Sequence, residues 1–86
     1  MDWGHLEYFL AVARTGSLSG AAKQLGVNHS TVARRLEKLE QQLNVRLFDR
    51  LNNGYRLTDD GLALKAHAAQ VEREINQIQG VFSGSE

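Results

Sequence analysis

Polar and cationic side chains recur at helical spacing in the middle of the chain. Ser30, Arg34 and Lys38 are each four residues apart, so on a helix they share one face. An arginine can donate two parallel hydrogen bonds to a guanine edge, and a lysine can neutralise a backbone phosphate. The spacing is therefore typical of a surface that contacts nucleic acid.

The same segment carries an apolar stripe on its other side. The residues of this stripe are Val32, Leu36, Leu39 and Leu43. Their spacing predicts an amphipathic helix over residues 28–43, with the stripe buried and the polar face exposed. At 100° per residue, Ser30 and Arg34 lie almost opposite the stripe.

Eight residues of this helix are candidate DNA contacts. They are Asn28, His29, Ser30, Thr31, Ala33, Arg34, Arg35 and Lys38. Arg34 suits a guanine edge, and Ala33 offers a methyl group to thymine. Arg35 and Lys38 suit backbone phosphates, and the free N–H groups of the first turn favour a phosphate as well.

A shorter helix precedes this one. Ala21, Ala22 and Leu25 are small or apolar helix formers, and Gly26 supplies the positive φ with which a chain leaves a helix. Two helices joined by so tight a turn form a helix-turn-helix, whose second helix fits the DNA major groove. A first helix is expected between Asp2 and Gly16.

A β-hairpin is expected after the helix-turn-helix. Asn52-Asn53-Gly54 is a strong hairpin turn signal. Because two strands do not stand alone, we expect Leu47, Phe48 and Leu57 to pack on the helices and form a wing. In the wing over residues 46–57, the candidate minor-groove or phosphate contacts are Arg50, Asn53 and Arg56.

A long helix is predicted to close the chain. Thr58 can cap its start, and Asp59 and Asp60 lie where the helix dipole favours acids. Its apolar residues are Leu64, Ala68, Val71, Ile75, Ile78 and Phe82. Their steps of 4 and 3 give a 3.5-residue period, which is typical of helix pairing. We call these six residues the seam. We expect the seam to form a homodimer interface, and part of it can also pack on the first helix.

The predicted fold is mainly α. A winged helix-turn-helix of three helices and a two-stranded β wing takes residues 1–58, a linker or dimerisation helix takes residues 59–82, and residues 83–86 are expected to fray. Dimerisation would help this chain of 86 residues, because a domain of that size buries little of its surface.

Composition narrows the classes of function. The formal net charge is zero, but residues 28–58 carry net +3 and residues 59–86 carry net −3, so a basic region can still attract phosphate. The sequence has no cysteine, no histidine cluster and no run of apolar residues long enough to span a membrane. We therefore expect no metal or cofactor, and a cytoplasmic, nucleoid-associated protein. Asp59 and Asp60 diverge on a helix, and no phosphate-binding motif or catalytic constellation is present, so an enzyme is not expected.

The chain resembles the N-terminal DNA-binding domain of LysR-type transcriptional regulators. The residues that carry the resemblance are Leu6 to Phe9, Ala11 to Ala13, Gly16 to Leu18, Ala21, Ala22, Leu25, Val27, Val32, Leu39, Glu40, Leu43, Leu47, Phe48, Arg50, Leu57, Thr58 and Gly61. The resemblance implies a dimer that binds a partly palindromic operator. His29 and Ala33 replace a glutamine and a serine usual in the family, so the base preference should differ.

The family usually continues into a larger effector-binding domain, which this sequence lacks, and the Ser-Gly-Ser-Glu end favours an excised domain. A small-molecule effector is expected only where such a domain exists. The sequence thus predicts a sequence-specific DNA-binding domain of a transcriptional regulator. The alternative is a protein-interaction module that captures a partner helix on the seam of residues 64–82.

Overall fold

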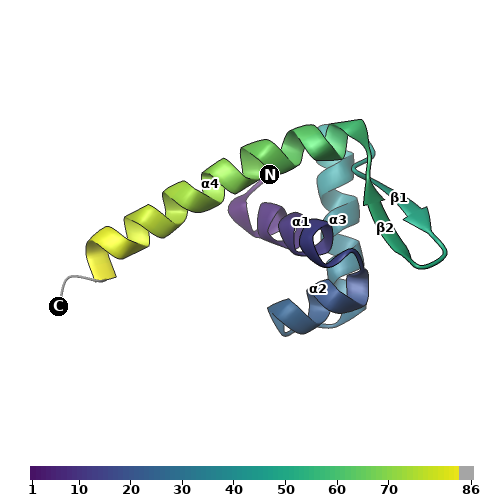
Figure 1. Cartoon of the computed structure of the whole chain (residues 1–86), viewed down its shortest axis with the longest axis horizontal. Helices are drawn as coiled ribbons and strands as arrows, with labels where there is room; N and C mark the ends of the chain where they lie inside the picture. Colours follow the sequence, from purple (N-terminus) through teal and green to yellow (C-terminus); the bar gives the residue numbers. More distant parts are fainter. Residues whose placement is uncertain (84–86) are drawn as a thin grey trace.

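The computed structural model describes residues 1–83, and these residues form four helices and one β-hairpin (Figure 1). In chain order, the elements are α1 (Trp3–Thr15), α2 (Leu18–Leu25), α3 (His29–Leu43), β1 (Phe48–Leu51), β2 (Gly54–Leu57) and α4 (Asp59–Ser83). The predicted fold, a winged helix-turn-helix followed by a long helix, is confirmed. The three short helices and the hairpin make a head, from which α4 extends (Figure 1).

The head is held by one hydrophobic core that all its elements share. Its largest fully buried side chains are Phe9, Leu10, Val12, Val32, Leu39 and Leu47. The rings of Phe9 and Phe48 lie 5.4 Å apart between centroids, which joins α1 to the first strand of the wing. The wing therefore shares one core with the helices, as expected for its predicted anchors Leu47 and Phe48.

Local capping chemistry sets where the helices begin and end. The carboxylate of Asp2 accepts a hydrogen bond from the His5 N–H at 3.1 Å, and the Ser17 hydroxyl accepts one from the Gly20 N–H at 2.9 Å. Gly26 ends α2 at φ 70°, where an L side chain would be strained, and Asn44 ends α3 at φ 56°. Helix α3 begins at His29, one residue later than predicted, because Asn28 is an extended N-cap residue.

The wing is pinned to the head at both of its ends. β1 and β2 pair antiparallel, with Phe48 opposite Leu57 and Leu51 opposite Gly54, around the predicted Asn-Asn turn. At the tip end, the Tyr55 N–H donates to the carbonyl of Gly16 at 2.9 Å. At the base, the Leu47 N–H donates to a carboxylate oxygen of Glu40 in α3 at 2.7 Å. These bonds fix the hairpin relative to the helix-turn-helix.

Helix α4 starts against the base of the wing. The Thr58 hydroxyl accepts from the Gly61 N–H at 3.0 Å and donates to the Arg46 carbonyl at 2.6 Å. A Cβ on Gly61 would collide with the carbonyl oxygen of Leu47. The close approach of the two backbones therefore depends on glycine at residue 61.

The two halves of α4 have different surroundings. Leu64 packs against the core and Ala68 is 1% exposed, so the predicted packing of part of the seam on the head is confirmed. Further along, Ile78 is 57% exposed and Phe82 is 81% exposed. The described chain measures 47 × 25 × 18 Å along its principal axes, and its long dimension comes from this arm (Figure 1).

The predicted boundary after residue 82 is one residue early, since α4 includes Ser83. The expected fraying of residues 84–86 lies outside the described residues. Among residues 1–83, no helix combines the length and apolar character needed to cross a membrane. The same part of the chain contains no group of three or more histidine, cysteine or acidic side chains placed to hold a metal ion.

Candidate nucleic-acid interface

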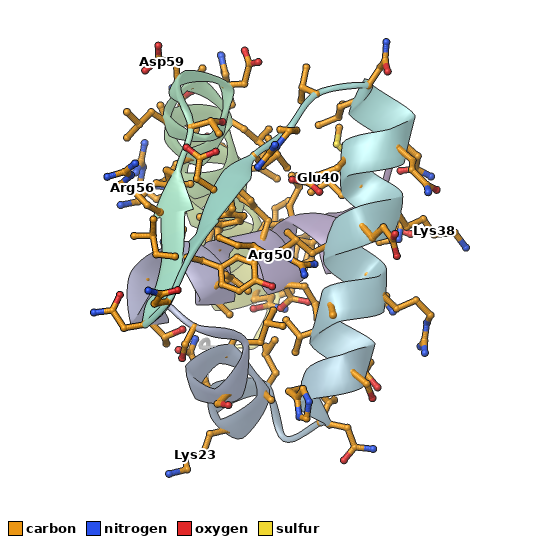
Figure 2. The ribbon with its side chains drawn as sticks, turned by 90° about the vertical axis from the view of Figure 1, so that its right-hand side faces the viewer. Lys23, Lys38, Glu40, Arg50, Arg56 and Asp59 are labelled. Carbon is orange, nitrogen blue, oxygen red and sulfur yellow. The ribbon has the colours of Figure 1, made fainter. Side chains whose placement is uncertain are left out.

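Helix α3 and the wing stand side by side on one face of the head (Figure 2). A cavity between them has a volume of about 380 Å³. The cavity is lined by Ala33, Leu36, Glu37, Glu40, Arg46, Phe48, Arg50 and Tyr55. The core contacts of α3 and the hydrogen bonds of the wing fix the two walls of this cavity. The shape of this face therefore depends on contacts within the chain.

The first turn of α3 presents three exposed polar side chains, those of Asn28, His29 and Ser30. Asn28 is the N-cap residue, yet its side chain makes no capping hydrogen bond within the described chain. Thr31 is half-buried beside it. Because the positive end of a helix dipole lies here, an anionic group is favoured at this turn.

The middle of α3 presents the two predicted cations. Arg34 and Lys38 are both exposed and lie one turn apart. Ala33, on the side of α3 that lines the cavity, is half-buried. In Figure 2 the side chain of Lys38 points away from the wing. From its N-terminus, the exposed side chains of α3 thus include an imidazole (His29), a hydroxyl (Ser30), a guanidinium (Arg34) and an ammonium group (Lys38).

Arg35 lies elsewhere than the sequence suggested. Its guanidinium carbon is 4.6 Å from the centroid of the Tyr8 ring in α1, and the residue is half-buried. Its Nε is buried without a hydrogen-bond partner among the described residues. The side chain crosses back over α1 because its Cα lies one position, about 100°, from that of Arg34 around the helix. The structure therefore places the Arg35 guanidinium against α1, and the phosphate contact of Arg35 stays a prediction.

The three candidate residues of the wing, Arg50, Asn53 and Arg56, are all exposed. Arg50 lies between the wing and α3, with its guanidinium 5.7 Å from the centroid of the Tyr55 ring (Figure 2). Arg56 lies on the side of the wing away from α3. Tyr55 itself packs edge-on against Phe48, with 5.8 Å between the ring centroids. The wing therefore offers cations on both of its sides.

Charged residues that were not among the candidate DNA contacts also line the cavity. Arg46 forms a 3.3 Å ion pair with Asp49, and Glu37 is exposed on the wall made by α3. One carboxylate oxygen of Glu40 accepts from the Leu47 N–H at 2.7 Å, so this acid holds the base of the wing. The spacing of seven residues between Glu40 and Leu47 gives no local signal, because the contact forms only when the chain folds back after α3.

The seam of α4 is divided by the fold. Leu64 and Ala68 pack against the core of the head. Val71 is 39% exposed, Ile75 is half-buried, and Ile78 and Phe82 are exposed. Val81, which the 3.5-residue pattern omitted, is 68% exposed and extends the apolar surface. The distal half of α4 thus presents apolar side chains to solvent.

Known proteins are similar to this chain in sequence and in fold. Residues 3–62 match the family described as "Bacterial regulatory helix-turn-helix protein, lysR family". An uncharacterized HTH-type transcriptional regulator from the ibpB-leuC intergenic region of Azotobacter vinelandii is 43% identical over 91 residues. The match covers 98% of this chain and 63% of that relative, so the chain spans less than two thirds of the relative's length.

Solved structures give the same result for the fold. The crystal structure of a CbnR_DBD-DNA complex is 34% identical with a TM-score of 0.85, covering 90% of this chain and 88% of that one. The crystal structure of a BenM_DBD/catB site 1 DNA complex is 26% identical with a TM-score of 0.90, covering 94% of this chain and 91% of that one.

Proposed function

The chain belongs to the LysR family of bacterial regulatory helix-turn-helix proteins, and we propose that it is a sequence-specific DNA-binding module of a transcriptional regulator. The observation that carries the proposal is the outer face of α3, where Ser30, Arg34 and Lys38 form a polar and cationic row beside the wing. The two structurally similar domains named above were each solved with DNA. That likeness supports the same use of this face.

In this proposal α3 enters the major groove. Arg34 donates to a guanine edge, and Ser30, Thr31 and His29 reach a base edge or a phosphate. The amide of Asn28, which is not used for capping within residues 1–83, binds at the first turn. Lys38 contacts the backbone, and the half-buried Ala33 allows close approach or a thymine methyl contact.

The wing lies along the neighbouring backbone or minor groove. Arg50, Asn53 and Arg56 are exposed along it, and arginine is favoured where a narrow minor groove concentrates negative potential. The hydrogen bonds from the Tyr55 N–H to Gly16 and from the Leu47 N–H to Glu40 of α3 hold the hairpin at a fixed distance from the helices. This fixed distance lets the two elements contact adjacent grooves together.

We propose further that two chains pair through α4. The supporting observation is the row of exposed apolar side chains along its distal half, of which Phe82 is 81% exposed. A helix of another protein could cover the same surface, and the mass of the purified chain distinguishes the two. A dimer places two heads on two half-sites, which is how a partly palindromic operator is read.

Such a module acts without catalysis. The relative from Azotobacter vinelandii is described as a transcriptional regulator, and the proposal needs neither a cofactor nor a metal. A regulator bound to chromosomal DNA would work in the bacterial cytoplasm, at the nucleoid. A small-molecule effector would act through a further domain in a longer protein.

The proposal is tested by titrating fluorescent duplexes with the chain. Random duplexes are first selected for binding, and the selected half-site is compared with a scrambled one. We expect tighter binding to the selected site, with an affinity that falls steeply between about 50 and 200 mM salt as counterions are released. Equal affinity for both duplexes, or binding that does not change with salt, contradicts the proposal.

A further inference from the structure

One ion pair ties the arm to the head. The two terminal guanidinium nitrogens of Arg14, at the end of α1, donate to the two carboxylate oxygens of Glu72 in α4, at 2.9 and 2.6 Å. The two residues are 58 positions apart in the chain. A two-point arginine–carboxylate contact fixes orientation as well as distance, because both planar groups must face each other.

The pair lies where it can set the direction of the arm. Ala68, which is 1% exposed, is the place where α4 packs closely on the head, and Glu72 is one helical turn further along. The side chains of Arg14 and Glu72 are 41% and 28% exposed, so water only partly screens them. The hydrogen bonds from Arg14 lower the pKa of Glu72, which keeps this carboxylate charged.

A small change of angle has a large effect at this geometry. From Ala68 to Ser83, α4 extends about 22 Å at 1.5 Å per residue. A rotation of about 10° at Ala68 therefore displaces the end of the arm by about 4 Å, close to the rise of one base pair. In a dimer joined through its arms, the same rotation turns each head about Ala68, so the position and angle of the two α3 helices relative to each other change.

We propose that the Arg14–Glu72 pair is a positioning pair that determines which half-site spacing the dimer accepts. The inference rests on the proposed function, because it needs two heads joined through α4. Arg14 and Glu72 touch no DNA in this proposal. They act through the angle between α1 and α4, so they affect the recognition of spacing and leave the recognition of a single half-site unchanged.

The first experiment separates these two effects. The wild-type chain is compared with Arg14→Gln, with Glu72→Gln and with the charge-swapped double variant Arg14→Glu/Glu72→Arg. The matched control is Glu74→Gln, which removes a carboxylate from an exposed residue of the same helix. Each chain is titrated with a duplex bearing one half-site, and with duplexes whose two half-sites are moved by up to about three base pairs in either direction.

We expect all five chains to bind the single half-site equally. The wild-type chain and the control should show one preferred spacing, and each single variant should lose about two- to fivefold of that preference, the range that a partly exposed ion pair supports. The charge-swapped variant should regain the preference. Single variants that keep the wild-type spacing profile, or a swapped variant that stays as broad as the single variants, would overturn the inference.

A second measurement needs no DNA, so it tests whether the pair sets the angle of α4 independently of the proposed function. The sequence contains no cysteine, so Lys23→Cys in α2 and Gln77→Cys in α4 place two unique spin labels on exposed residues. The doubly labelled chain is diluted with unlabelled chain, so that the distances measured are within one molecule. Adding Glu72→Gln should broaden the distance distribution and Glu74→Gln should not; a distribution unchanged by Glu72→Gln refutes the positioning role.

Discussion

The guanidinium of Arg35 in α3 lies over the ring of Tyr8 in α1, 4.6 Å from its centroid. This contact separates two consecutive arginines by role. Arg34 is exposed on the outer face of α3, whereas Arg35 is half-buried and joins α3 to α1. The orientation of α3 therefore depends in part on Arg35, a residue that the sequence pattern suggests is a DNA contact.

Replacing Arg35 should affect folding more than binding. Arg35→Met keeps an unbranched side chain but removes the charge over Tyr8, and a partly desolvated cation–π contact contributes about 1 kcal/mol to the free energy of unfolding. Urea denaturation measures that loss. The dependence of DNA affinity on salt should stay that of the wild-type chain; a slope reduced by about one would instead mean that Arg35 neutralises a phosphate.

Arg34 and Lys38 should respond differently to truncation. Arg34→Ala should weaken binding to the selected duplex by about 1–3 kcal/mol and relax the preference at one base position. Lys38→Ala should weaken binding to every duplex similarly and reduce the salt slope by about one. Repeating the selection of random duplexes with each variant tests the difference. An unchanged base preference for Arg34→Ala removes this residue from base readout.

Substituting alanine for two glycines of α4 should change the free energy of unfolding in opposite directions. Gly61→Ala should lower the free energy of unfolding by about 1–3 kcal/mol, because the added Cβ meets the backbone of Leu47 and must displace it. Gly80→Ala should raise it by up to about 1 kcal/mol, because a Cβ there meets nothing within 4 Å among the described residues and alanine favours a helix. Thermal melts of both variants decide the question, and equal shifts would contradict the close approach at Gly61.

A charge on the exposed seam should separate the two subunits. Ile78 is 57% exposed in the single chain, so Ile78→Glu should leave the head folded but weaken the dimer about tenfold or more, since an apolar interface disfavours an unpaired carboxylate. Analytical ultracentrifugation over a range of concentrations measures the shift. The control is Gln77→Glu, which adds the same charge outside the 3.5-residue seam. A mass that is monomeric for the wild-type chain would favour capture of another protein's helix.

The Arg14–Glu72 pair should make stability depend on pH in one direction. The hydrogen bonds from Arg14 lower the folded-state pKa of Glu72, so the ionised carboxylate binds better in the folded chain. The stabilisation is fully present above the ordinary glutamate pKa, about 4.3, and is lost as the pH falls through the lower folded-state value. The difference in unfolding free energy between the wild-type chain and Glu72→Gln should therefore vanish in acid, and a difference that grows in acid would contradict the pairing.

Much of this molecule could be read from the sequence, because the relevant forces are local and periodic. The apolar stripe from Val32 to Leu43 determines which face of α3 is buried, and therefore that Arg34 is exposed. Capping groups such as Ser17 and the turn residues Asn52 and Asn53 mark the ends of elements within a few residues of the chain. These features need no knowledge of distant contacts.

Tertiary structure alone decided the contacts between residues far apart in the chain. Arg35 is diverted onto Tyr8 of α1, Glu40 accepts from the backbone at Leu47, and Arg14 meets Glu72 across 58 positions. No periodicity encodes these meetings, because they depend on the angles at which finished helices pack. The sequence thus determined that the chain has a helix with a cationic outer face and a long helix with apolar residues. Packing decided that Arg35 contacts α1, and it decided the direction in which α4 leaves the head.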